Sequence, residues 1–105
     1  MQRDKVQRLL GLAARAGGVA FGEGAAEDSV RSKRARLAVV AADASDNTKK
    51  RLGDKCAFYG VRLIELGDRY ELGGCMGKDF AVAAAVTNAD LAKEILKQYE
   101  SRDGE

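Results

Sequence analysis

The chain has 105 residues, the usual size of one domain, so a second independently folded core is not expected. Hydrophobic residues make up 46% of it, mainly Ala, Val and Leu, and Trp is absent, which predicts a core of small side chains. The formal net charge is +2. Residues 100–105 have a net charge of −2, so the preceding part of the chain is mildly basic, with a net charge of +4. That balance permits a polyanionic partner without requiring one.

The sequence contains no His and only two cysteines, Cys56 and Cys75, which stand outside any CxxC pattern. Because His is the commonest metal ligand and general base, we expect no catalytic residues, no metal site and no cofactor. Cys56 fits a buried position on a helix face, whereas the role of Cys75 stays open. No signal peptide and no apolar run of the ~20 residues needed to cross a membrane is visible, so a cytoplasmic protein without membrane contact is expected.

The first third of the chain predicts two helices separated by a short strand. Apolar residues at helical spacing predict a helix over 4–16 that ends at Gly17 and Gly18, since glycine suits a left-handed C-cap. An apolar stretch at 19–21 predicts a strand, and a second helical pattern follows over 23–32.

The middle of the chain predicts a strand, a helix and a second strand. The unbroken apolar run at 37–42 is typical of a strand that is covered on both faces. A helix follows after an N-cap at Ser45 or Asp46 and ends at Gly60. A strand at 61–66 completes a βαβ unit, which indicates an α/β class with helices above and below the sheet.

The last third predicts, in order, a short helix at 68–72, an irregular loop at 73–79, a strand at 80–86 and a helix capped by Thr87 or Asn88. The residues from Glu100 onward lack apolar periodicity and predict a disordered tail. The expected organisation is therefore a single domain over 1–99 and a polar tail over 100–105.

Three loops are candidates for function: the junction at 22–24, the polar loop at 43–47 and the loop at 73–79. Their glycines and short polar residues let a backbone approach phosphate or an unstacked base. The glycines lack the spacing of a dinucleotide fingerprint or a P-loop, so no nucleotide cofactor is expected. The carboxylates of Glu23 and Glu27 are expected to lie on the surface.

Basic residues cluster in the first turns of the helix after Ser45, where Lys49, Lys50 and Arg51 follow one another. Positive charge there opposes the helix macrodipole. Two explanations stay open: an anion docks nearby, or these side chains form a solvated face.

A set of segments carries a resemblance to a known family. They are Gly11-Leu-Ala-Ala-Arg15 with Gly17, Gly22-Glu23, the run over 35–45 that ends in Asp43-Ala-Ser45, Asn47-Thr48, Lys55-Cys56, Leu72-Gly73 with Gly77, and residues 83–87. Their order and spacing resemble the superfamily of kink-turn-binding ribosomal proteins that includes L-seven-Ae and L-thirty-e, and most closely its bacterial YlxQ-like branch.

The resemblance implies a three-layer α/β/α sandwich around a four-stranded mixed sheet, whose three loops converge on structured RNA. It implies a monomer that binds ribosomal or translation-associated RNA, with RNA read at distorted, splayed regions. The residues expected to contact RNA are Gly22, Glu23, Gly24, Ala25, Asp28, Lys33, Arg34, Asp43, Ser45, Lys49, Lys50, Cys75, Met76, Gly77 and Lys78.

The chain departs from the kink-turn binders at the second helix. Their pattern resembles Gly-x-Asn-Glu-x-x-Lys, whereas Gly24, Ala25 and Asp28 occupy the Asn, Glu and Lys positions here. We therefore predict noncatalytic binding of structured RNA, but not of a standard kink-turn with high affinity. The alternative is a protein-interaction module on the same fold; an enzyme that uses a crevice at the strand ends is least expected.

Overall fold

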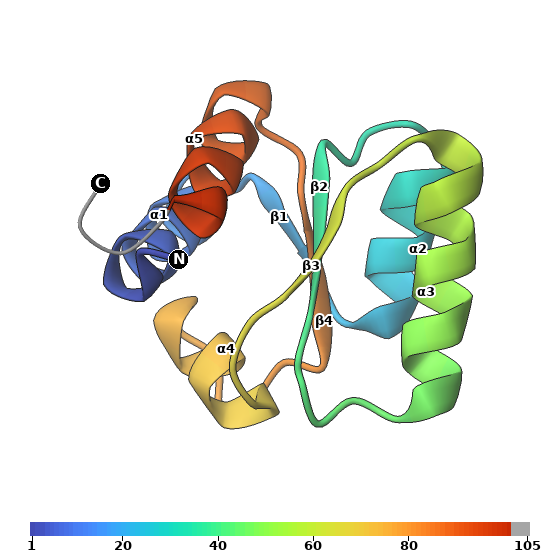
Figure 1. The fold of residues 1–105 in the computed structure, drawn as a ribbon, viewed down its shortest axis with the longest axis horizontal. Coiled ribbons are helices and arrows are strands. Elements are labelled where there is room, and N and C mark those ends of the chain that lie inside the picture. Colours follow the sequence, from blue (N-terminus) through green and yellow to red (C-terminus); the bar gives the residue numbers. More distant parts are fainter. Residues whose placement is uncertain (102–105) are drawn as a thin grey trace.

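The computed structural model describes residues 1–101, in which helices cover both faces of one sheet (Figure 1). The elements are α1 (Arg3–Arg15), β1 (Val19–Phe21), α2 (Glu23–Arg31), β2 (Leu37–Val40), α3 (Asp46–Tyr59), β3 (Leu63–Glu65), α4 (Arg69–Cys75), β4 (Ala83–Val86) and α5 (Ala89–Glu100). Helices α2 and α3 lie on one face, and α1, α4 and α5 lie on the other. The predicted α/β/α sandwich is confirmed.

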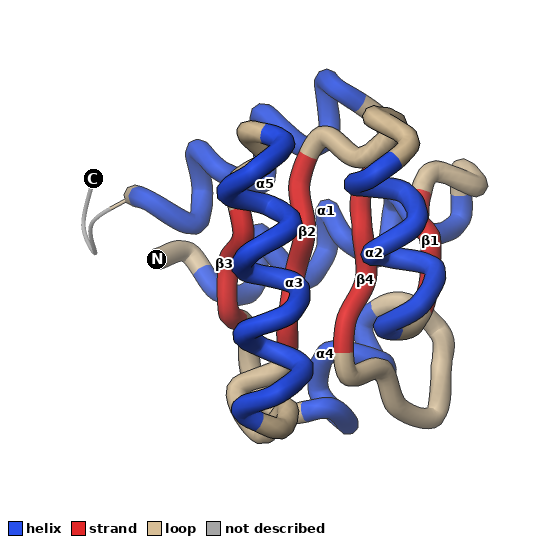
Figure 2. Tube along the Cα trace, turned by 90° about the vertical axis from the view of Figure 1, so that its right-hand side faces the viewer, coloured by secondary structure: helices blue, strands red, loops and turns tan. Residues whose placement is uncertain are grey.

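The sheet has the strand order β1-β4-β2-β3, which Figure 2 shows behind α2 and α3. Strands β2 and β3 are parallel, and β4 is antiparallel to both β1 and β2. The sheet is therefore mixed and four-stranded, as predicted. Because Phe21 pairs with Ala84, Val40 pairs with Ala83 and Glu65 pairs with Val40, the strands β1, β2 and β3 all end where β4 begins. We call this the loop end of the sheet, which is the lower end in Figure 1, and the opposite end the turn end.

Successive side chains of the central strands point to opposite faces of the sheet, and this divides the core into two layers. Leu37 and Val39 of β2 face the cluster under α1, α4 and α5, whereas Ala38 and Val40 face α2 and α3. Strand β4 alternates in the same way with Ala83 and Ala85 against Ala84 and Val86. The continuous apolar runs of the sequence thus reflect burial on both faces, as in other helix-covered sheets.

The predicted caps are found at most helix ends. Ser45, not Asp46, caps α3, and its Oγ accepts a hydrogen bond from the amide of Thr48 at 3.1 Å. Gly60 ends this helix in the left-handed conformation, with φ +70°. Asn88 caps α5 by accepting from the Leu91 amide at 2.9 Å. Local sequence therefore determines where these helices begin and end.

The prediction was wrong around the third loop, because helix α4 continues through Cys75. Asp68 and Glu71 form a reciprocal capping box that starts α4. Gly73 lies inside this helix. A glycine is needed at this position because the backbone of Phe80 passes so close that no side chain fits between them. Residues 80–82, which were predicted as part of the last strand, lie outside β4, which begins only at Ala83.

Other boundaries shift by a few residues. The strands predicted over 37–42 and 61–66 shorten to β2 and β3. Glu100, placed in the tail by sequence, is the last residue of α5 and forms an ion pair with Arg62 at 3.2 Å. The rest of the predicted tail beyond Ser101 lies outside the described residues. None of the helices within 1–101 has the length and apolarity that crossing a membrane requires.

Substituting Gly73 tests the close crossing of α4 and the segment before β4. A Cβ at this position would lie 2.5 Å from the Phe80 backbone carbons, so Gly73→Ala is expected to cost about 1–3 kcal/mol of unfolding free energy. Gly74→Ala is the matched control, because its Cβ meets nothing within 4 Å and alanine favours a helix by about 0.5–1 kcal/mol. Denaturant unfolding measures both, and equal effects would contradict the crossing.

Candidate nucleic-acid interface

Backbone hydrogen bonds join the segments that flank the three candidate loops at the loop end of the sheet. The Gly22 amide donates to the Ala83 carbonyl at 2.9 Å, which ties the start of α2 to the start of β4. The Ala41 amide donates to the Val82 carbonyl at 2.8 Å, and this links the loop after β2 to the same segment. The loops are therefore neighbours in space, as the resemblance implied.

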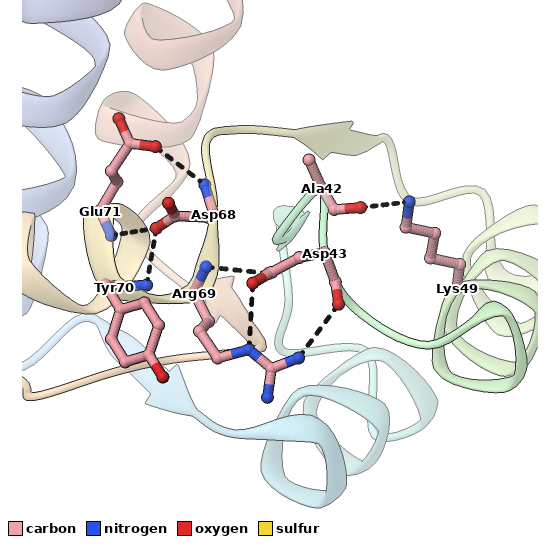
Figure 3. A network of polar contacts seen from close by, with 7 residues as sticks. All are labelled: Ala42, Asp43, Lys49, Asp68, Arg69, Tyr70 and Glu71. Carbon is pink, nitrogen blue, oxygen red and sulfur yellow. Dashed lines mark hydrogen bonds and ion pairs between the residues drawn. The ribbon is translucent and has the colours of Figure 1, made fainter.

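The Arg69 side chain clamps the loop after β2 to the start of α4 (Figure 3). Its amide and Nε donate to the two carboxylate oxygens of Asp43, at 2.9 and 3.1 Å, and its guanidinium also donates to the Asp43 carbonyl at 3.0 Å. The Arg69 carbonyl in turn accepts from the Ala81 amide at 2.9 Å. Charge-assisted bonds of this kind hold loops in one geometry. The Asp43 carboxylate is therefore bound by another residue of the same chain.

The start of α2 presents bare backbone to solvent. Its N-cap is Gly22, with φ +95°, a conformation that side chains rarely adopt. Within residues 1–101, no side chain hydrogen-bonds to the first amides of α2, whereas α3, α4 and α5 have side-chain caps. Gly24 and Ala25 of its first turn are exposed. Uncapped amides at a helix N-terminus attract anions and hydrogen-bond acceptors.

Exposed aromatic and basic side chains lie at the same end of the sheet as this helix start. The Lys78 ammonium lies 4.5 Å from the centre of the Phe21 ring, in a cation–π contact. Tyr70 and Phe80 are 66% and 58% exposed. Neither aromatic was predicted as a site residue; Phe80 was assigned to the start of a strand, and its exposure in the structure is what makes it a candidate.

The cations at the start of α3 are paired within the protein. The Lys49 ammonium donates to the Ala42 carbonyl at 2.6 Å and lies 3.5 Å from the Glu65 carboxylate. Lys50 lies 3.6 Å from Asp54. Both lysines are thus engaged by groups of the protein itself, and their predicted contact with RNA stays a prediction.

Glu27 is buried, which corrects the expectation that it lies on the surface. Only 7% of this residue is exposed, and its Oε2 accepts from the Arg51 guanidinium at 3.1 Å. Arg51 also approaches Glu23, at 4.0 Å. Oε1 of Glu27 has no hydrogen-bond partner among the described protein atoms. A buried carboxylate needs such a partner, so Arg51 is expected to anchor α2 to α3.

The two cysteines and Met76 are wholly or partly buried. Cys56 is buried, as predicted, and burial raises the pKa of its thiol to about 11. Burial also raises the pKa of the Cys75 thiol, whose Sγ donates to the Leu72 carbonyl at 3.1 Å. Both thiols are therefore protonated at neutral pH and poor nucleophiles. Met76 lies in the core under α1, which leaves Gly77 and Lys78 as the exposed part of that predicted set.

Three predicted site residues lie away from the loop end. Asp28 follows the first turn of α2 and forms an ion pair with Arg31 on the exposed side of the helix. Lys33 and Arg34 follow the last turn of α2. Two residues further on, the Arg36 amide donates to the Val86 carbonyl at the end of β4. Lys33 and Arg34 therefore belong to the turn end, and they cannot act in the same local contact as Gly22 or Lys78.

Within 1–101, His, Cys, Asp and Glu side chains form no group of three that could hold a metal ion. The loop end instead combines exposed amides, aromatic rings and a lysine on an α/β/α domain. That combination defines the class: a small binding domain with three convergent loops.

The chain matches the ribosomal protein L7Ae/L30e/S12e/Gadd45 family over residues 4–96. It belongs to this family, so the resemblance seen in the sequence is confirmed.

Curated relatives cover most of the chain. It is 40% identical over 88 residues to the RNA-binding protein YlxQ of Bacillus subtilis (strain 168), covering 84% of this chain and 88% of that protein. It is 38% identical over 97 residues to the RNA-binding protein YlxQ of Enterococcus faecium, covering 90% and 94%. The similarity thus extends over most of the chain.

Solved structures share the fold. A protein of unknown function from Bacillus halodurans has a TM-score of 0.90 at 33% identity, covering 92% of this chain and 98% of that one. The Giardia lamblia 15.5kD RNA binding protein has a TM-score of 0.79 at 21% identity, covering 94% and 88%. At that identity, the second likeness concerns the fold alone.

The buried ion pair between α2 and α3 leads to a stability prediction. Arg51→Gln is expected to lower the unfolding free energy by about 1–3 kcal/mol, because Glu27 loses the donor that offsets its burial. Lys50→Gln is the control, since its pair with Asp54 is exposed and worth no more than about 1 kcal/mol. Urea unfolding compares the two variants; similar losses would show that Arg51 does not anchor α2.

Proposed function

We propose that the chain binds structured RNA without catalysis, through a loop-end surface made of residues 22–25, Tyr70, Gly77, Lys78 and Phe80. One observation carries the proposal: the uncapped start of α2 lies at the same end of the sheet as an exposed lysine and two exposed aromatic rings. The names of the relatives from Bacillus subtilis and Enterococcus faecium support RNA as the ligand.

The start of α2 is suited to a phosphate or a base edge. Its free amides point out of the helix, and the macrodipole makes this end partially positive. Gly24 has nothing within 4 Å of the place where a Cβ would lie, so a ligand meets little steric hindrance there. The backbone itself therefore supplies donors that read shape and not sequence.

The aromatic rings are suited to unpaired bases. Stacking on an exposed ring is worth about 1–3 kcal/mol per base, and it is available only where RNA is splayed or single-stranded. Tyr70 and Phe80 lie on adjoining segments, because the Ala81 amide bonds to the carbonyl of Arg69. Lys78 adds a cation that the Phe21 ring holds in place. Together they favour a distorted RNA over a regular duplex.

The cognate RNA is proposed to differ from a standard kink-turn. Gly24 and Ala25 are exposed at the start of α2, where kink-turn binders of the resemblance carry Asn and Glu. They offer no side-chain hydrogen bonds to bases, and Asp28 is an anion in place of a cation. Ribosomal or translation-associated RNA, bound by a monomer in the cytoplasm, is the partner that we propose, and membership of a ribosomal protein family supports it.

The proposed function is tested by crosslinking the protein to RNA in cells and sequencing the attached RNA, beside titration of a standard kink-turn at several salt concentrations. Enrichment of one structured RNA with weak kink-turn binding is the expected result. Absence of both enrichment and salt-dependent binding would refute it and favour the protein-interaction module instead.

Removing the exposed ring of Phe80 tests how much stacking contributes to RNA affinity, because the charge of the protein does not change. Phe80→Ala is expected to weaken binding of the enriched RNA roughly tenfold, because one base loses its stacking partner. Phe58→Ala is the matched control, since Phe58 is 81% exposed but lies near the C-terminal end of α3. Fluorescence titration with unchanged circular dichroism measures both; equal affinity for the two variants would remove Phe80 from the surface.

Restoring the kink-turn pattern is expected to create the affinity that this chain lacks. The combined variant Gly24→Asn, Ala25→Glu and Asp28→Lys adds two side chains that can hydrogen-bond and reverses one charge. At about 1 kcal/mol per hydrogen bond, affinity for a standard kink-turn should rise by at least tenfold. The positions are exposed, so stability should change little. Unchanged kink-turn titration would show that the substitutions do not determine specificity.

A further inference from the structure

The turn end of the sheet contains a basic pocket that the loop-end surface does not use. Its volume is about 500 Å³, and it lies where β1 begins, β4 ends and α2 ends. Its polar walls come from Ser29, Lys33, Arg34, Arg36 and Thr87, with Gly17 at the edge. In Figure 1 this is the upper end of the molecule, opposite the loops.

The cations of this pocket have no acidic partners. Lys33, Arg34 and Arg36 form no ion pair within residues 1–101. At the loop end, by contrast, Lys49 and Arg69 are matched by carboxylates, and Lys78 lies over the Phe21 ring. Three unpaired positive charges within four positions repel one another, and an anion between them would relieve that repulsion.

Ser29 adds an unused donor at the base of the pocket. The residue is 2% exposed, and its Oγ has no hydrogen-bond partner among the described protein atoms. Its carbonyl is occupied, because it accepts from the Arg34 and Ala35 amides at 3.0 Å each. A buried hydroxyl without a partner is unfavourable, so the pocket favours a ligand that accepts a hydrogen bond from it.

The turn after α2 fixes the pocket cations in space. Lys33 adopts φ +66°, the only positive φ of a non-glycine residue within the described chain. Arg34 Nε donates to Ser32 Oγ at 3.1 Å, which orients its guanidinium. Attraction to the negative end of the α2 macrodipole accounts for a cation such as Lys33. It does not account for Arg36 at the start of β2, nor for the unpaired hydroxyl.

We propose that this pocket binds the phosphate groups of a second RNA segment. Guanidinium groups match phosphate oxygens with two parallel hydrogen bonds, and a hydroxyl donor completes the set. RNA as the source of the phosphate rests on the proposed function, whereas the anion pocket itself does not. The protein would then hold RNA at two opposite ends and bridge two segments.

NMR titration of the amides locates the site, first with inorganic phosphate and then with a short oligouridylate. The expected result is saturable shifts for residues 29–36 and Thr87, separate from those of residues 22–25. No shifts at residues 29–36 with either probe would overturn the proposal. Shifts with polyglutamate but not with oligouridylate would also overturn it, since the pocket would then serve a protein.

Two variants test the residues of the pocket. Ser29→Ala removes only the unpaired hydroxyl, so it should leave the melting temperature unchanged or raise it and weaken phosphate and oligouridylate binding roughly tenfold. The triple variant Lys33→Gln, Arg34→Gln and Arg36→Gln should lower the salt slope of oligouridylate binding by about 2, since each single-strand contact contributes about 0.7.

The matched control is a triple variant of exposed lysines on α1 and α5: Lys5→Gln, Lys93→Gln and Lys97→Gln. It removes the same charge, so an equal loss of salt slope would show only a general effect of net charge and overturn the proposal. Phe80→Ala distinguishes the two ends: the pocket shifts should persist in this variant even if the loop-end surface binds no RNA.

Discussion

The position of β4 between β1 and β2, antiparallel to both, determines what meets at each end of the sheet. Its backbone hydrogen bonds bring the ends of β1 and β2 to its own first residue, Ala83. The start of α2, the loop that holds Asp43 and the segment before β4 therefore converge, although long stretches of chain separate them. The same pairing leaves the turn after α2 beside Val86, at the other end.

Charge pairing distinguishes the two ends. At the loop end, Arg69 clamps Asp43 and Arg51 anchors Glu27, so these ionic groups support loop and helix geometry. The groups left exposed there include backbone amides, aromatic rings and Lys78, and groups of these kinds suit the proposed shape-reading interface. At the turn end, Arg34 and Arg36 have no such partners in the described chain and project into a pocket. The modest net charge thus conceals an uneven distribution.

Much of the fold is readable from the sequence, because its signals are local. Ser45 and Asn88 cap the helices that follow them, Gly60 ends α3, and the apolar run from Leu37 indicates a strand covered on both faces. The third loop was misread because the reason for Gly73 is not local. Glycine there permits a close crossing with Phe80, and a helix that tolerates two glycines is stabilised by its capping box and by packing.

The sequence by itself determined the class, the family and two of the three loops, since periodicity, caps and the spacing of characteristic residues are properties of neighbours along the chain. Only the tertiary structure decided which residues are available to a ligand. It buried Glu27 and Met76, gave Lys49 and Asp43 partners inside the protein, and separated Lys33 from the loops. Burial and ion pairing depend on which distant segments meet, and the packing of strands and helices against one another settles that.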